Sequence, residues 1–578
     1  MCYEYSSEAP LSECTYPLVN IFLLCCLEYA FEHQNRKLFH WSDCSSSQVV
    51  AQPDDLLRPK KLEKLLRRQG FAGNTYRILY GDLKDEAAMR EQPKKLEKVL
   101  REQGFAGNSY RILYGDLKFR AAMREQALSK PMNFSNDIAP RVIPSIHHTI
   151  QNYGKNSFMW LGPIPRVHIM DPEQLKIVFS LINDFQKPTI NPFARLLADG
   201  ILNHEGPKWV KHRKIINPAF HLEKLKDMVP AFYHSCNEMV SKWENMVFVE
   251  GSCELDVMPY LQNMTADVIS RTAFGSSYEK GKKIFKLQTE LVELVIQSTL
   301  GVYIPGWRFL PTKSNNKMKE ISNEITTLIL DIMSEREKSM KAGEAIQTDL
   351  LIILMKSNLN EIKQHGSNKD IGMSIEDVIA ECKLFYIAGQ ETTATLLVWT
   401  MVLLSSYLEW QEQARAEIFE IFGNKKPDYD GLSRLKVVTM IFNEVLRLYP
   451  PVSMFGRFVK KETRLGKLTL PAGVMLALPT ILIQRDPELW GEDANEFKPE
   501  RFSKGVSKAT KNPSAFVPFG LGPRICIGLN FAMIEAKLAL SMILQRFSFE
   551  LSSSYTHAPT VTITTQPQHG AHIILHKL

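Results

Sequence analysis

The sequence lacks the features that mark several common classes of protein. Its nine cysteines are scattered and none lies in a C-x-x-C pair, which argues against a zinc site or a secreted disulfide framework and fits a reducing compartment. No basic run is interleaved with aromatic residues, so a nucleic-acid partner is not expected. A nicotinamide or flavin fingerprint is also missing, because Gly520-Leu521-Gly522 begins like G-x-G-x-x-G but has Ile525 where the third glycine belongs.

A long apolar run is missing near the start of the chain. Ile21–Leu27 is seven residues long and is bounded by Asn20 and Glu28, whereas a membrane-spanning helix needs about 20 apolar residues. The run also lacks the charged region that opens a signal peptide. We therefore expect residues 1–58 to form an atypical N-terminal segment without a clear membrane anchor.

An internal repeat follows this segment. Pro59–Gln92 and Pro93–Gln126 are 34 residues long and differ at five positions. A period of about 34 residues suggests tetratricopeptide repeats, but there are only two copies, and each has Tyr-Arg-Ile-Leu-Tyr-Gly-Asp in place of a second packing helix. We interpret residues 59–126 as a tandem duplication, from a duplicated exon or an imperfect gene model, and residues 127–578 as the main domain.

The main domain is long, apolar and helical in pattern. The chain has 578 residues, 44% of them hydrophobic, and we see no Gly/Ser- or Pro-rich linker after Pro131. Helical periodicity dominates from Pro172 to Phe549, and short β-type runs occur at residues 158–161, 166–169, 468–470 and 561–564. These patterns predict one mainly α domain with a small β-sheet.

The most specific pattern is a single cysteine in a glycine-rich loop, Phe519-Gly520-Leu521-Gly522-Pro523-Arg524-Ile525-Cys526-Ile527-Gly528. Glycines let backbone N–H groups approach a metal-bound sulfur, and the positive charge of Arg524 favours a thiolate. A lone cysteine is usually a small buried hydrophobe. The residues around Cys526 favour a thiolate metal ligand instead.

A second pattern interrupts a long apolar helix. The segment from about Ile375 to Leu408 is apolar nearly all round, which indicates a buried helix, and Ser374 with Asp377 predicts a capping box at its start. Ala388-Gly389-Gln390-Glu391-Thr392-Thr393 is a polar patch inside it. Gly389 costs a helix interior about 1 kcal/mol relative to alanine, which suggests that room is needed there. The alternative is a kink with hydroxyl groups bonded back to the preceding turn.

Charged residues form two further patterns. Glu444 and Arg447 share a helix face that should end at Pro450-Pro451, although such pairs are common on surfaces, where they contribute little. In the segment 206–213, Pro207 suits a first helical position, and Trp209 and Arg213 lie on one face. The alternative for this segment is a basic surface helix.

Taken together, these patterns resemble the cytochromes P-450 over roughly Pro93 to Leu578. The motif Phe-x-x-Gly-x-Arg-x-Cys-x-Gly matches at every fixed position, namely Phe519, Gly522, Arg524, Cys526 and Gly528. The resemblance implies a cytochrome P-450 fold with haem b held between the long central helix and the cysteine loop, and with Cys526 as the axial ligand. It also implies the remaining roles: proton delivery to dioxygen by Glu391 and Thr392, propionate binding by Trp209, Arg213 and Arg457, and a buried supporting network of Glu444, Arg447 and Arg501.

Finer stretches are similar to the secologanin-synthase-like branch of the plant microsomal members, which oxidise terpenoid and related skeletons. These stretches are residues 212–220, 274–278, 304–312 and 566–572. The resemblance places substrate near Ile387, Ala388, Val452, Phe455 and the turn 562–565, where ordinary core packing is the alternative. The cytosolic face of the endoplasmic reticulum membrane is the location that the family implies.

The resemblance implies a haem-thiolate monooxygenase domain at residues 127–578. Such an enzyme inserts one atom of O2 into a C–H bond of a hydrophobic small molecule, with electrons from NADPH through a separate reductase. The net charge of +7 suits an acidic redox partner or an anionic membrane surface. Two other functions stay open: a haem-thiolate lyase or isomerase, whose usual mark is loss of the acid–threonine pair, and a non-catalytic haem-binding protein.

Overall fold

The computed structural model describes residues 83–578 apart from 112–114, 189–192, 248–250, 276–277, 301–311, 343–348 and 365–371. The N-terminal segment 1–58, most of the first repeat copy and nearly all of the stretch 304–312 lie outside the described residues.

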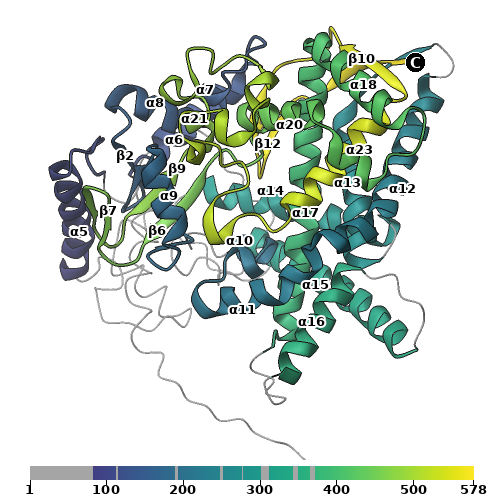
Figure 1. Cartoon of the computed structure of the whole chain (residues 1–578). Coiled ribbons are helices and arrows are strands. Elements are labelled where there is room, and N and C mark those ends of the chain that lie inside the picture. The colour runs from purple at the N-terminus through teal and green to yellow at the C-terminus, as the bar shows by residue number, and fades with distance from the viewer. Residues whose placement is uncertain are drawn as a thin grey trace, which may run out of the picture.

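Helices make up most of the described chain, and a smaller strand-rich part lies at one side (Figure 1). The helices of eight or more residues are α5 (Leu83–Glu102), α6 (Leu117–Ser129), α8 (Pro144–Tyr153), α9 (Pro172–Ser180), α11 (Gly206–Ile216), α12 (Leu222–Val247), α13 (Val257–Phe274), α14 (Tyr278–Leu300), α15 (Lys313–Lys341), α16 (Leu350–Gln364), α17 (Ile375–Ser406), α18 (Leu408–Phe422), α20 (Val437–Leu448) and α23 (Leu529–Leu544). The shorter ones are α7 (Ala139–Val142), α10 (Ala194–Leu197), α19 (Tyr429–Arg434), α21 (Thr480–Ile483) and α22 (Pro487–Trp490), with 3-10 turns at η1 (Gly200–Leu202), η2 (Asn217–Phe220), η4 (Pro499–Phe502), η5 (Val506–Lys508), η6 (Pro513–Ala515) and η7 (Gly522–Arg524).

Helix α17 forms the centre of the helical part, with α13 and α23 packed beside it (Figure 1). The predicted capping box is confirmed, since Ser374 and Asp377 exchange side chain–backbone hydrogen bonds. Within the described part of the chain, α17 is the helix long and apolar enough to cross a membrane by composition, but 72% of its most apolar window is buried inside the protein. A helix enclosed by others needs no polar face, which accounts for its nearly uniform hydrophobicity.

The largest sheet has six strands in the order β1-β2-β3-β9-β6-β4. Its members are β1 (Ala106–Gly107), β2 (Ser157–Leu161), β3 (Ile164–His168), β9 (Met475–Leu478), β6 (Phe455–Val459) and β4 (Phe185–Gln186). Smaller sheets pair β10 (Phe547–Leu551), β13 (His572–Lys577) and β5 (Ser252–Asp256), β11 (Pro559–Val561) with β12 (Thr565–Pro567), and β7 (Thr463–Leu465) with β8 (Leu468–Leu470).

The predicted strand at 561–564 is wrong in its position. Residues 562–564 form the bend of a hairpin between β11 and β12, whose antiparallel register pairs Val561 with Thr565. Eight other strands were not predicted from the sequence, namely β1, β4, β5, β6, β7, β9, β10 and β13. Four-residue β9 is buried at every position, and a short apolar run without alternation cannot be distinguished from buried helix by periodicity.

The second repeat copy packs against the main domain. Strand β1 pairs in parallel with β2, and the Trp160 indole N–H donates to the backbone oxygen of Asn108 at 2.9 Å. Leu100 and Phe105 are buried in the apolar cluster under the six-stranded sheet. The division of the chain at residues 59–126 stays a prediction.

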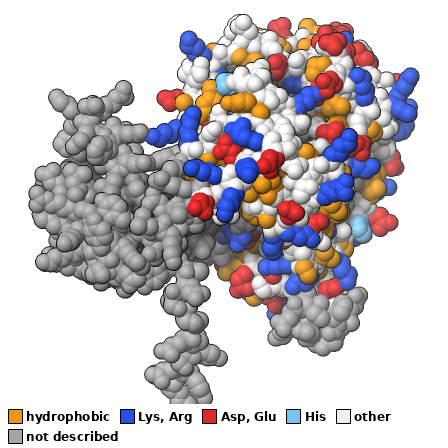
Figure 2. Space-filling model, turned by 90° about the vertical axis from the view of Figure 1, so that its left-hand side faces the viewer, with side chains coloured by type: hydrophobic (Ala, Val, Ile, Leu, Met, Phe, Trp, Pro, Cys, Tyr) orange, Lys and Arg blue, Asp and Glu red, His pale blue; other side chains and the backbone are white. Residues whose placement is uncertain are grey.

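Two apolar clusters fill the interior, a large one among the helices and a smaller one beneath the sheet. On the face shown in Figure 2, acidic and basic side chains are interspersed, with small apolar groups between them. The partly exposed residues that interrupt the large cluster are therefore candidates for the functional site.

Candidate functional site

The cysteine loop is a closed turn that precedes α23. The Cys526 backbone N–H donates to Phe519 O at 2.9 Å. Gly520 and Gly522 have φ of +74° and +71°, and a Cβ on Gly522 would lie 2.8 Å from Phe179 O. Only glycine accepts both the positive φ and the close approach of Phe179 O at Gly522.

Protein atoms surround Cys526, but its side chain is still exposed. The sulfur therefore faces a space beside the loop. Burial raises the pKa of the Cys526 thiol, while the Gly528 backbone N–H and the charge of Arg213 oppose that shift. A Cβ on Gly528 would lie 3.9 Å from the sulfur. The loop therefore leaves the sulfur approachable, and a metal cation in front of it would supply the missing stabilisation of a thiolate.

A cluster of cations lies next to this loop. Arg524 donates to Glu205 Oε2 at 2.5 Å and to His204 O at 2.7 Å. Burial, with repulsion from Arg457 and Arg524, lowers the pKa of Lys187 to about 7, although Glu205 opposes the shift. Three cations face one carboxylate, and the buried Arg457 Nε has no hydrogen-bond partner. Because a pKa of about 7 leaves Lys187 only partly charged near pH 7, the excess lies between one and two positive charges, which suits a ligand with carboxylate groups.

Helix α11 supports the loop from one side. Trp209 is buried, and its ring lies 4.7 Å from the Arg524 guanidinium carbon. Arg213 Nη1 donates to Ile525 O at 3.1 Å. The structure thus brings both predicted residues to the cysteine loop, where they contact its backbone and its arginine.

The polar patch of α17 is the accessible part of an otherwise buried helix. Residues 388–392 are exposed or half-buried, while Ile387 and Thr393 on either side are buried. Thr392 Oγ1 donates to Ala388 O at 2.8 Å, in the back-bonded manner of the alternative considered above. A Cβ on Gly389 would lie 2.7 Å from Ile269 Cδ1. Room is therefore needed at Gly389, as predicted, and Ile269 of α13 takes it.

Glu391 is tied to the hairpin between β11 and β12. Thr564 Oγ1 donates to Glu391 Oε2 at 3.1 Å, and the Gln566 amide donates to the same oxygen. Burial raises the pKa of Glu391, and these two hydrogen bonds oppose the shift. Thr395 donates to Thr564 Oγ1 at 2.9 Å. Burial therefore favours the protonated form of Glu391, and the two hydrogen bonds favour its carboxylate.

The other predicted substrate-facing residues divide into two groups. Val452 and Phe455 are half-buried, and Phe455 lies close to Gly520 of the cysteine loop. Ile387, Thr564 and Thr565 are buried, and Thr565 donates to Pro450 O at 2.8 Å. The hydroxyl groups of Thr564 and Thr565 already donate to neighbouring elements of the protein.

The predicted charge network is buried and hydrogen-bonded. Arg447 makes two 2.7 Å hydrogen bonds to Glu444, and both side chains are fully buried. Its other N–H groups donate to the backbone oxygens of Gln484, Ala494 and Glu496. Arg501 contacts this pair more loosely, with Nε 3.7 Å from Glu444 Oε1, and bonds mainly to Asp493.

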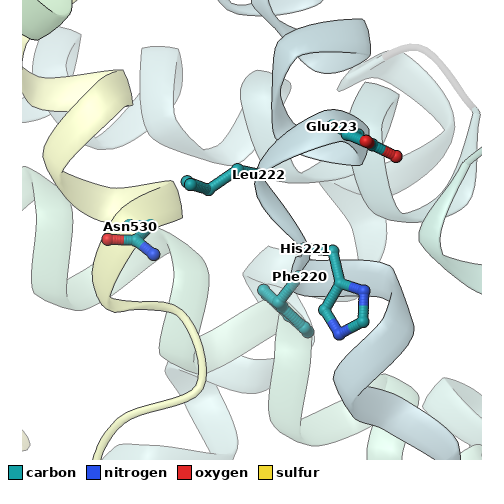
Figure 3. A pocket seen from close by; sticks show the side chains of 5 residues that line it. All are labelled: Phe220, His221, Leu222, Glu223 and Asn530. Carbon is teal, nitrogen blue, oxygen red and sulfur yellow. The ribbon is translucent and has the colours of Figure 1, made fainter.

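A pocket of about 450 Å³ lies on the outer side of the cysteine loop, lined by Phe220, His221, Leu222, Glu223 and Asn530. Figure 3 shows Asn530 at the start of α23 and Leu222 pointing toward that helix. Leu222 is 49% exposed. Phe220 of this pocket lies near the cysteine loop, because a Cβ on Gly528 would also lie 4.0 Å from it.

Haem b fits the residues present. An approachable thiol beside the charge of Arg213, an unpartnered buried arginine nitrogen and a cationic excess match iron and two propionates. Lys187 and Glu205 belong to this arrangement and were missed by the sequence analysis. Neither lies in a motif, and no local pattern marks them.

Comparisons with known proteins agree with this arrangement. A family model described as cytochrome P-450 matches residues 142–573. Cytochrome P-450 72A397 of Kalopanax septemlobus is 60% identical over 520 residues, which cover 90% of this chain and 93% of the relative. The 7-deoxyloganic acid hydroxylase of Catharanthus roseus is 56% identical over 525 residues, which cover 90% and 94%.

Fold and site define a haem-thiolate protein. The chain belongs to the cytochrome P-450 family, in a plant branch that includes the 7-deoxyloganic acid hydroxylase. It is a monooxygenase whose cofactor is haem b, and it uses O2, a redox partner and a small-molecule substrate. The family and the hydroxylase relative favour this activity over the lyase, isomerase and non-catalytic alternatives.

Proposed function

We propose that this protein hydroxylates an unactivated C–H bond of a terpenoid or related plant metabolite, with electrons from an NADPH-dependent cytochrome reductase. The observation that carries the proposal is the accessible patch of α17, residues 388–392, with its acid–threonine pair intact. The bound haem would supply the chemistry of dioxygen activation. The chain's own residues would hold the cofactor, position the substrate and move protons.

In this proposal Cys526 ligates the iron, and Arg457, Arg524, Lys187, Trp209 and Arg213 hold or surround the propionates. Phe519, Gly522 and Gly528 shape the loop. The support is the unpartnered Arg457 Nε and the cationic excess described above. Glu444, Arg447 and Arg501 keep a structural role, and they touch neither cofactor nor substrate.

Proton delivery is assigned to Glu391 and Thr392. Burial raises the pKa of Glu391, so its carboxyl group can carry a proton at a higher pH than an exposed glutamate. The Thr392 hydroxyl donates to Ala388 O in the structure and can rotate to pass a proton. General acids work best when their pKa lies near the operating pH.

The proposed substrate class rests on the relatives. One of them is named as a hydroxylase of 7-deoxyloganic acid, and similar chains share most of their length with this one. Half-buried Val452 and Phe455 offer apolar contacts for such a skeleton. The cytosolic face of the endoplasmic reticulum membrane is the proposed location, by the same argument from the family.

The reductase is proposed to dock near the cysteine loop, around the pocket lined by Leu222 and Asn530. Lys208 and Lys214 on α11 are exposed, and Lys224 on α12 is half-buried. An exposed apolar residue ringed by cations suits an acidic electron donor.

The first test is the absorption spectrum of the dithionite-reduced, carbon-monoxide-bound protein. We expect the strongly red-shifted Soret band of a thiolate trans to the bound gas. A band like that of a histidine-ligated globin would refute Cys526 as the ligand.

The second test measures turnover in microsomes that contain the reductase and NADPH, with a panel of iridoid acids and triterpenoids. We expect a product larger by one oxygen atom for at least one member. Thr392→Ala should keep haem but divert electrons to peroxide, and full coupling of NADPH use to product in that variant would remove the proton-delivery role.

A further inference from the structure

Helix α13 lies against one side of α17 and contacts it at successive turns. The rings of Phe274 and Tyr386 are stacked, with their centroids 4.0 Å apart and their planes 4° from parallel. At the next turn of α17, a Cβ on Gly389 would lie 2.7 Å from Ile269 Cδ1. The two helices are therefore in close contact where the polar patch of α17 begins.

A hydroxyl group of α13 reaches the backbone of this patch. Thr265 is fully buried, and its Oγ1 donates to the backbone oxygen of Gln390 at 3.1 Å. The same Oγ1 lies 3.1 Å from Gln262 O within its own helix, so its one hydrogen is shared between the two acceptors. Through this contact, α13 bonds directly to the main chain of the accessible patch.

Hydroxyl groups also bond to neighbouring carbonyl oxygens of the patch. Thr392 Oγ1 donates to Ala388 O at 2.8 Å, and Thr395 Oγ1 donates to Glu391 O at 2.8 Å. A hydroxyl group that bonds to a helical carbonyl competes with the main-chain hydrogen bond and often bends the helix. These two donors belong to α17 itself, whereas Thr265 is fixed on α13 and can hold the weakened turn in one position.

The patch is held from a second side by the hairpin between β11 and β12. Glu391 comes two residues after Gly389, so it projects about 160° away from it around the helix axis. Its carboxylate accepts a hydrogen bond from Thr564 at 3.1 Å. A shift of α17 relative to α13 would therefore move the carboxyl group against the hairpin.

We propose that Thr265 is a positioning residue, which holds the acid–threonine pair of α17 in place through Gln390 O, while the contact of Ile269 with Gly389 sets the separation of the helices. This role rests on the proposed function, since it assumes that the pair delivers protons. Without the Thr265 hydroxyl, the turn would move, and NADPH, a proton and O2 would more often yield NADP+ and hydrogen peroxide in place of product.

The first test separates the hydroxyl group of Thr265 from its methyl group. Thr265→Val removes the hydroxyl and keeps a similar shape. In holoenzyme with reductase and a substrate from the turnover panel, it should raise peroxide formed per NADPH about two- to tenfold, the change in population that one net hydrogen bond supports. Thr265→Ser keeps the hydroxyl, so its peroxide yield should stay near wild type, while its loss of a buried methyl group should lower its unfolding temperature.

Thr272→Val is the matched control. Thr272 is a buried threonine about two turns further along the same helix, and its Oγ1 donates to Val268 O at 2.7 Å, within α13. Its peroxide yield should equal that of wild type. Equal yields in Thr265→Val and Thr272→Val, or a rise in Thr265→Ser as large as in Thr265→Val, would overturn the positioning role.

The proposed function is tested separately by Thr392→Ala. A rise in peroxide in Thr392→Ala but not in Thr265→Val would reject the positioning role alone. No rise in Thr392→Ala would reject proton delivery by the pair, and the role of Thr265 with it.

A second measurement needs no substrate. The infrared C–O stretch of the reduced, carbon-monoxide-bound protein responds to the polar groups beside the gas, because their electric field changes the polarity of the C–O bond. Thr265→Val should shift or broaden this band relative to wild type, and Thr272→Val should leave it in place. An unchanged band in Thr265→Val would overturn the positioning role.

The contact between the helices is tested by the same band. Gly389→Ala should shift it, because the added methyl group would push α17 away from Ile269. Ile269→Ala in the same protein should restore it, since the Ile269 atom that remains beside the new methyl group, Cβ, lies 3.4 Å away. A shift that persists in the double variant would contradict the role of this contact.

Discussion

Two buried polar clusters differ in how their charges are satisfied. Around Glu444 and Arg447, the guanidinium donates to a carboxylate and to three backbone oxygens, and the Lys498 backbone N–H donates to Glu444 at 2.9 Å. Around His212 and Glu381, three side chains meet with atoms that lack a hydrogen-bond partner.

The difference separates buried charges that the protein pairs completely from polar atoms that keep a free donor or acceptor. A buried charge that the protein itself pairs has no capacity left for another molecule. A buried polar atom without a partner costs about 1–3 kcal/mol, and it stays available to a ligand that reaches it. Arg457 Nε belongs to the second kind, and the approachable sulfur of Cys526 is likewise free to bind a ligand.

The largest effect is expected where the self-paired cluster is broken. Arg447→Ala would leave Glu444 charged and buried without its partner, which typically costs about 3–5 kcal/mol. We expect the variant to lose most of its folded, haem-bound protein, measured as haem per protein and by thermal unfolding.

Arg546→Ala is the control for that loss. Arg546 lies 3.8 Å from Glu244, and both side chains are exposed, so at most about 1 kcal/mol should be lost. Similar losses in the two variants would contradict the assignment of Glu444 and Arg447 to fold support.

The next largest effect is expected from a substitution that removes the iron ligand but keeps the fold. Cys526→Ser should abolish the thiolate-type spectrum of the reduced, carbon-monoxide-bound protein, because serine does not replace the thiolate on iron. Cys382→Ser is the matched control, since burial raises the pKa of that thiol and it lies within the apolar core. An unchanged spectrum in Cys526→Ser would show that another group ligates the iron.

A smaller effect is expected at the cationic cluster. Arg457→Met should release haem faster by about tenfold or more, because a hydrogen bond to a charged group contributes about 1.5–3 kcal/mol. Transfer of haem to apomyoglobin measures the rate. Arg457→Lys keeps the charge, and its rate of haem release should lie between those of wild type and Arg457→Met. A rate equal to wild type in Arg457→Met would show that Arg457 does not bind a propionate.

The smallest effect concerns the pH dependence of coupling. Gln566 donates to Glu391 and so favours its carboxylate. Gln566→Leu should raise the Glu391 pKa further, and the fall in coupling as Glu391 ionises should move to higher pH by about one unit.

The measurement is product formed per NADPH between pH 5 and 9. Gln568→Leu, on the same hairpin but bonded to Leu128 O, should leave the profile in place. A shift to lower pH in Gln566→Leu would contradict the proposed effect on Glu391.

Sequence reasoning succeeded where the determinants are local. The capping box of α17, the pairing of Glu444 with Arg447 and the strand β8 each depend on residues within four positions of one another, so spacing alone predicts them. The glycines of the cysteine loop belong to this group as well, because their φ values are local properties.

Contacts between distant segments were decided only in the tertiary structure. Glu391 meets a threonine 173 residues away, Gly389 makes room for Ile269 on another helix, and Lys187 joins Arg524 only through folding. The chain's own sequence determined the cysteine loop, the central helix and the family, because short-range geometry and a motif carry them. Packing decided which buried charges find partners, because that depends on which elements meet.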